Sequence, residues 1–210
     1  YKHNFSGNDP ANYSVTALVN APDGTLWIGS QFGLYRFDPL TGTFTSYNQY
    51  IDNKSGKNDK WVSSLLLDNS GVLWIGTRHG LYSFEPATDR ITLYNHDSNN
   101  PKSLNSDNIK AILEDASGRL WVGTEMGLNR LNPDTGDFIS FKNEPNNLSS
   151  LSHDWVEHLL EDSTGTLWVN THNGLNKFDD KTETFTRHLY IDILKVPEIG
   201  VQSKKLVEDS

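Results

Sequence analysis

Residues 113–130 read LEDASGRLWVGTEMGLNR, and this stretch decides the fold because the chain repeats its pattern at a constant step. Tryptophans recur every 47 residues, at Trp27, Trp74, Trp121 and Trp168. Turn glycines keep the same step, at Gly24, Gly71, Gly118 and Gly165. A fixed period of this length indicates an array of supersecondary units, none of which buries its apolar surface alone.

Each unit contains four short strand signals. In the second unit they cover 61–67, 72–77, 81–84 and 91–94, and turns rich in Asp, Asn, Gly and Pro separate them. Short β-branched and aromatic runs between such turns predict antiparallel strands. Four strands per unit at this period predict an all-β protein built from β-propeller blades. We expect one domain over 1–210, with blades at about 14–47, 61–94, 108–141 and 155–188.

The repeat step also bears on the two ends of the chain. Adding one step to Leu160–Ser163 gives Val207–Ser210, which repeats the Glu-Asp-Ser of the earlier unit. Residues 189–210 are therefore expected to be a connector and the first strand of a fifth blade. Four full repeats and one strand do not close a ring in an obvious way, so we expect part of a larger propeller. A four-bladed ring, or two half-rings pairing into eight blades, are the alternatives.

Two repeated residue types have structural interpretations. The pattern Asp68-x-x-Gly71 recurs at Asp115 and Asp162, and it predicts a capped tight turn rather than a calcium loop, which needs more oxygen ligands. The repeated tryptophans lie in strand centres, so we assign them to packing between blades rather than to stacking on a sugar.

Composition excludes several functions. The net charge is −9, and the longest basic cluster is the pair Lys204-Lys205, which argues against nucleic-acid and anionic membrane binding. Without cysteine there are no disulfides, thiol nucleophiles or thiolate metal sites. The segment His153–His158 has suitable residue types for a metal, but its spacing matches no zinc motif, and solvated or pore-lining residues are the better interpretation. We expect no metal and no cofactor.

The pattern quoted above, together with the connector Asn99–Leu104, resembles the two-component-regulator propeller repeat, and residues 15–188 fit it as four units. The resemblance implies the periplasmic sensor region of a bacterial membrane signalling protein, such as a hybrid histidine kinase or a diguanylate cyclase receptor. It also implies recognition of small molecules, often carbohydrate fragments, with membrane contact only through parts that this chain lacks. One departure is Asn170, which replaces the strand-end glycine and predicts a different strand exit in the fourth unit.

Candidate ligand-binding residues are those that differ between units on one face. The second-to-third turns and the long connectors between units share a face, where binding residues concentrate in scaffolds of this kind. Unconstrained loop drift explains the same variation equally well. The candidates are the middle pairs of these turns and two aromatic residues before the first strands: Gln31, Phe32, Arg78, His79, Glu125, Met126, His172, Asn173, Trp61 and Trp155.

Three functions remain in competition at this stage. We expect a non-enzymatic sensor module that binds a small solute, with an oligosaccharide as one candidate. The chief rival is an enzyme of the lyase or lactonase type on a propeller scaffold, because a fold does not fix a function. The third is a structural propeller that docks proteins, and a homodimer is left open.

Overall fold

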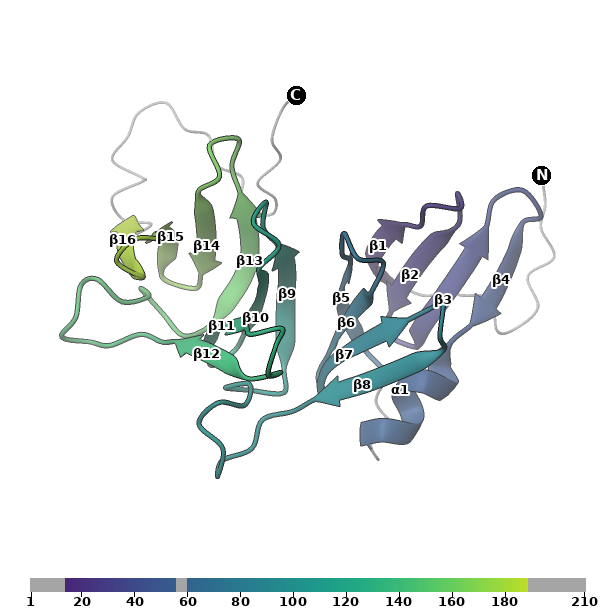
Figure 1. The fold of residues 1–210 in the computed structure, drawn as a ribbon, viewed down its shortest axis with the longest axis horizontal. Coiled ribbons are helices and arrows are strands. Elements are labelled where there is room, and N and C mark those ends of the chain that lie inside the picture. The colour runs from purple at the N-terminus through teal and green to yellow at the C-terminus, as the bar shows by residue number, and fades with distance from the viewer. Residues whose placement is uncertain (1–13, 56–59, 189–210) are drawn as a thin grey trace.

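The computed structural model of the protein describes residues 14–55 and 60–188, which form four sheets of four antiparallel strands (Figure 1). Sheet one contains β1 (Val15–Asn20), β2 (Leu26–Ser30), β3 (Gly33–Asp38) and β4 (Thr43–Ser46). Sheet two contains β5 (Val62–Leu67), β6 (Leu73–Thr77), β7 (Gly80–Glu85) and β8 (Arg90–Tyr94). Sheet three contains β9 (Ile109–Glu114), β10 (Leu120–Thr124), β11 (Gly127–Leu131) and β12 (Phe138–Phe141). Sheet four contains β13 (Val156–Glu161), β14 (Leu167–Thr171), β15 (Gly174–Asp179) and β16 (Thr184–His188).

The sheets are arranged as blades. Their first strands β1, β5, β9 and β13 lie toward the middle of the molecule, and their fourth strands lie at the periphery (Figure 1). Neighbouring first strands contact one another in the order β1, β5, β9 and β13. The predicted all-β class with four-stranded antiparallel blades is therefore confirmed. The expected fifth-unit strand within 189–210 lies outside the described residues.

The first connector contains a helix, α1 (Asn48–Ser55), where a loop was expected. Its residue Ile51 is buried, and the Ile51 carbonyl accepts a hydrogen bond of 2.9 Å from the Tyr82 hydroxyl in sheet two. The Tyr50 ring lies 5.0 Å from the Phe84 ring, also in sheet two. The helix is thus held by its contacts with the next blade, which a local sequence pattern does not reveal. Among the described residues, no helix is long and apolar enough to cross a membrane.

The first hairpin turn of each later sheet is built around its aspartate. In sheet three, one carboxylate oxygen of Asp115 accepts hydrogen bonds from the backbone N–H groups of Ser117 and Arg119. The other oxygen accepts from the indole N–H of Trp121 at 2.7 Å and from Arg119 Nε at 2.7 Å. Gly118 follows at φ 77°, a left-handed conformation that glycine adopts without strain. The predicted turn-capping role of this aspartate is confirmed, and the carboxylate also fixes the repeated tryptophan.

The hydrogen bonds at these turns stabilise the charged form of the carboxylates. Burial alone raises the pKa of Asp115, but the bonds from Trp121 and Arg119 outweigh burial and hold this pKa below its usual value. Bonds from the Thr164 hydroxyl and the Trp168 indole hold the pKa of Asp162 well below its usual value. The most perturbed carboxylates of the sheets are therefore structural ones.

The apolar cores lie between the sheets. The Trp27 ring lies 6.0 Å from Phe84 of the next sheet, and the Trp121 ring lies 5.1 Å from Phe178 of the next sheet, both edge-on. Trp74 belongs to a cluster that joins sheets two and three. Trp168, in the last described sheet, is only half-buried beside the His188 ring. Each interface buries aromatic area from two blades, which is where most of the stabilisation by burial arises.

A glycine near the end of the second strand allows each blade to approach the next. A Cβ atom on Gly123 would lie 2.6 Å from Val156 Cγ1, the first residue of the next blade's β13. Gly29 and Gly76 have the same relation to the following blade. In sheet four Asn170 stands at this position, yet β14 ends as the other second strands do, with Thr171 Oγ1 donating to the Gly174 carbonyl. The different strand exit predicted from Asn170 is therefore wrong.

Candidate functional site

The predicted turn residues and the predicted aromatic residues meet in space. In sheet two, Val62 is the register partner of Thr77, so the residue before β5 lies beside the residue after β6. The guanidinium of Arg78 accordingly lies over the Trp61 ring, 4.1 Å from its centroid. In sheet four the same relation places the His172 ring 4.6 Å from the Trp155 ring, nearly parallel to it.

Sheet three has a polar pair at the equivalent place. Asn108 Nδ2 donates a hydrogen bond of 2.8 Å to Glu125 Oε2. Asn108 was not among the predicted site residues, although it occupies the position of Trp61 and Trp155 in the 47-residue step. The 47-residue step alone would have identified Asn108 as a candidate.

The turns that present these residues have a constant frame. In sheet two, Thr77 Oγ1 accepts a hydrogen bond from the His79 backbone N–H at 3.0 Å and donates to the Gly80 carbonyl at 2.8 Å. Thr124 and Thr171 make the equivalent bonds in sheets three and four, and Ser30 does so in sheet one. The glycine after each turn has a positive φ, for example 125° at Gly127. The scaffold is therefore fixed, and the middle pair of each turn is the part that varies.

Five of the candidate side chains are exposed on this face. Phe32 is 44% exposed and Met126 is 48% exposed, which is unusual for large apolar residues. Arg78 and His172 are exposed as well, and so is Asn173. His79 and Gln31 are partly buried, and the backbone carbonyl of His79 accepts a hydrogen bond from Asn95 Nδ2.

A hollow of about 420 Å³ joins the candidates of sheets two and three. Arg78 lines it from one sheet, and Glu125 and Met126 line it from the next. Asn108 completes the wall, together with a connector segment that includes Asp107. Asp107 Oδ1 accepts a hydrogen bond of 2.6 Å from the His96 backbone N–H, so the connector is held in place. A concave site with a few convergent polar groups on a rigid frame is what a small solute requires.

The fourth blade has stacked rings at the equivalent turn. The His172 ring stacks against both Trp155 and His153, with the His153 ring centroid 5.6 Å away, and His172 Nε2 lies 2.9 Å from Glu157 Oε1. Lys110 Nζ of sheet three lies 4.7 Å from the Trp155 ring centroid. Both predicted tryptophans are therefore in contact with cationic or imidazole groups of the protein. A sugar ring would have to displace one of these groups to stack on Trp155.

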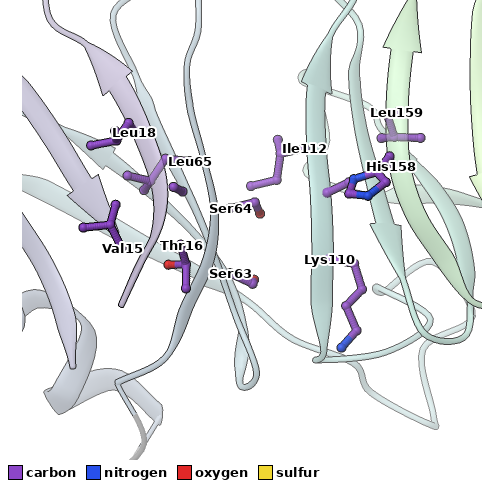
Figure 2. Close-up of a pocket in the computed structure, with 12 residues that line it drawn as sticks. Val15, Thr16, Leu18, Ser63, Ser64, Leu65, Lys110, Ile112, His158 and Leu159 are labelled. Atoms are coloured by element: carbon purple, nitrogen blue, oxygen red, sulfur yellow. The ribbon is translucent and has the colours of Figure 1, made fainter. Parts of the chain in front are cut away.

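An open pocket of about 510 Å³ lies between the first strands (Figure 2), and we call it the central channel. His158 lines it, whereas Glu157 on the same strand is paired with His172. The two neighbours thus serve different sites, as expected from their positions on a strand, and the pore-lining interpretation holds for His158. Lys110 also lines the channel, and sequence reasoning missed it. Within the described residues, no cluster of three His, Asp or Glu side chains is arranged to hold a metal ion.

Comparison with known proteins agrees with this architecture, and the class is a β-propeller. The family model described as two component regulator propeller matches residues 9–32, 56–79 and 103–126. The chain therefore carries two component regulator propeller repeats. A search of curated proteins returned no match.

Three solved structures illustrate the fold similarity. The first is the extracellular domain of a protein described as a one component system from B. thetaiotaomicron, at TM-score 0.67 and 22% identity, covering 83% of this chain and 21% of that one. The second is the extracellular domain of a protein described as a hybrid two component system from the same organism, at TM-score 0.56 and 22% identity, with coverages of 83% and 30%. The third is a catalytically inactive virginiamycin B lyase from Staphylococcus aureus with quinupristin, at TM-score 0.63 and 18% identity, with coverages of 89% and 58%. The chain thus spans well under two thirds of each of these structures.

Proposed function

We propose that this chain is part of the periplasmic sensor region of a bacterial membrane signalling protein, and that it binds a small polar solute on its turn face. We define the turn face as the second-to-third turns together with the residues that precede the first strands. The repeat family supports the sensor class. The observation that supports this most is the hollow between sheets two and three, because Arg78, Glu125 and Met126, which differ between repeats, line it together.

The chemistry of the hollow favours a neutral, hydroxyl-rich ligand such as a sugar. Arg78 supplies hydrogen-bond donors and Glu125 supplies acceptors from opposite walls. A sugar hydroxyl both donates and accepts, so it can bridge the two groups. Met126 offers an exposed apolar contact for the carbon face of a ring. An oligosaccharide fragment is therefore the ligand class that we propose.

A thermal-shift screen of neutral oligosaccharides against the intact chain tests the proposal. A solute at a concentration of about 100 times its Kd adds about 2.7 kcal/mol of stability. For a protein of this size that stabilisation raises Tm by roughly 5 to 10 °C. The shift should disappear in Arg78→Ala and in Glu125→Ala. It should persist in Asn69→Ala, which alters an exposed turn at the opposite end of the blades. Broad sets of solutes that leave Tm unchanged would refute the sensor function.

One observation favours the enzymatic alternative. His172 Nε2 lies 2.9 Å from Glu157 Oε1, and the His153 ring stacks against the same imidazole. A histidine oriented by a carboxylate is a recurring general base. Lyase or lactonase activity that is lost in His172→Ala, with binding at the hollow unchanged, would establish the enzyme in place of the sensor.

A further inference from the structure

The residue at the start of each first strand varies between the sheets, and in sheets one to three it lines the central channel. A β-bulge lies there in all four sheets, for example between Val62 and Ser64 in sheet two. Bulges re-aim side chains, and at the rim of a closed structure they often shape a site. The bulged residues are related by the repeat step: Thr16, Ser63, Lys110 and Glu157. Their identities differ, whereas the aliphatic residues Leu18, Leu65, Ile112 and Leu159 repeat just beyond them.

The first two bulged residues are structural. Thr16 Oγ1 donates a hydrogen bond of 2.5 Å to the Val62 carbonyl of the next blade. Ser63 Oγ donates one of 2.6 Å to the Ile109 carbonyl, again in the next blade. A hydroxyl at this position therefore joins neighbouring first strands, and the first two blades use it in the same way.

The third and fourth blades lack this hydroxyl and carry Lys110 and Glu157 at its position. Lys110 stands in the place of the hydroxyl residue, and its side chain lines the channel (Figure 2). Its ammonium group lies 4.7 Å from the centroid of the Trp155 ring. One residue further along, His158 occupies the position held elsewhere by Ala17, Ser64 and Ala111. His158 is exposed and lines the same channel. Neither side chain is needed for the joint between strands that the hydroxyls provide.

The residues that line the channel carry positive charge, whereas the chain as a whole is negatively charged. The sequence contains 27 acidic and 18 basic residues, yet none of the residues lining the channel in the described structure is Asp or Glu. The nearby carboxylate of Glu157, on the same strand as His158, is engaged by His172. An ammonium and an imidazole in a concave site without lining carboxylates attract an anion.

We propose that the central channel is a binding site for a small hydroxylated carboxylate, with Lys110 and His158 as its ligand-binding residues. The ammonium of Lys110 pairs with the carboxylate at one end of the pocket, and the imidazole of His158, which lies further along the pocket, hydrogen-bonds a hydroxyl group of the same ligand (Figure 2). The aliphatic side chains that line the pocket contact the carbon skeleton of this ligand; they are Leu18, Leu65, Ile112 and Leu159. This channel site is separate from the neutral-solute site, which is the hollow between sheets two and three.

The repeat supplies variants that keep the fold. Lys110→Ser installs the residue of blade two, whose hydroxyl joins neighbouring strands, and His158→Ala installs the residue of blades one and three. Lys177→Gln is the matched control. Lys177 Nζ also lies over a repeated tryptophan, 5.9 Å from the Trp168 centroid, but it does not line the channel. The Tm of each variant checks that folding is retained.

The test is calorimetric titration of the intact chain with D-glucuronate and with D-glucose, its neutral counterpart, at low ionic strength. We expect saturable binding of glucuronate, at least about tenfold tighter than any binding of glucose, because one charge-assisted contact is worth about that factor. Lys110→Ser should weaken glucuronate binding by about tenfold, and Lys177→Gln should leave it unchanged. His158→Ala should weaken it as well, and this variant decides the matter if Lys110→Ser does not fold.

Three outcomes overturn the channel site. The first is equal affinity for glucuronate and glucose. The second is no heat of binding with glucuronate up to about 50 mM, a range that covers very weak sites. The third is glucuronate binding that is unchanged in Lys110→Ser or, where that variant does not fold, in His158→Ala. None of these results bears on the turn face, where Arg78→Ala is the deciding variant. A neutral sugar that binds there and depends on Arg78 upholds the proposed function even if the channel site fails.

Discussion

Gly123→Ala tests how closely successive blades must pack. The added methyl group would lie 2.6 Å from Val156 Cγ1 and 3.1 Å from Val156 Cβ, inside van der Waals contact with a residue that is fully buried. Overpacking of a tight core costs about 1 to 3 kcal/mol. Alanine also has less conformational freedom than glycine in the unfolded chain, which stabilises the folded state by roughly 0.4 to 1 kcal/mol and offsets part of this cost. We therefore expect a net loss of about 1 to 2 kcal/mol, or roughly 2 to 8 °C in Tm.

The cause can be isolated by a double-mutant cycle with Val156→Ala. Val156→Ala alone removes two buried methyl groups and should cost about 2 kcal/mol. In the double variant the two alanines fit each other, so the loss should be smaller than the sum by about 1 kcal/mol or more. Urea unfolding, followed by fluorescence and by circular dichroism to check that the transitions coincide, measures each free energy. Strictly additive losses, or a Gly123→Ala variant as stable as the parent, would refute the close-approach argument.

Three further predictions concern the turns and the turn face. Asp115→Asn places an amide against the indole N–H of Trp121 and against Arg119, and should cost about 2 to 3 kcal/mol in urea unfolding. Asp23→Asn, at an exposed turn where the carboxylate bonds Thr25 and Arg36, should lower the urea midpoint clearly less. Because the pKa values of Asp115 and Asp162 are lowered in the folded state, their stabilisation is complete above the unfolded pKa of about 4 and is lost as pH falls through the lower folded values. Urea midpoints measured from neutral to acidic pH should fall in that window, and a midpoint that rises there would contradict the assignment. Trp61→Ala removes the platform under Arg78, so it should weaken solute binding at the hollow by roughly three- to tenfold with little change in Tm, and Trp155→Ala, outside the hollow, is its comparison in the same titration.

The 47-residue step was sufficient to predict the blades and their turns. Trp121 and Asp115 act within one unit, so a local pattern in a single sequence reveals them. The step also indicated where the variable residues gather, because Arg78 and Trp61 are neighbours whenever a hairpin joins the two strands.

Features that depend on contacts between units could not be predicted in this way. The helix α1 forms because Ile51 and Tyr50 pack against the next blade, and its own sequence has no strong apolar periodicity. The bulge that directs Lys110 into the channel is a property of how the first strands meet around the channel. The prediction of a different strand exit from Asn170 was wrong for a related reason, because the hydrogen bond at the end of the strand is made by the Thr171 hydroxyl.

The account rests on one claim, that recognition belongs to the residues that do not repeat while the repeated ones hold the frame. The most direct test is a backbone-amide NMR titration of the intact chain with the neutral sugar that raises its Tm most. The account predicts saturable shifts at 78–79, 125–126 and the segment around Asn108, with the hairpins at 68–71, 115–118 and 162–165 unaffected. Shifts confined to those hairpins, at the opposite end of the blades, would contradict it.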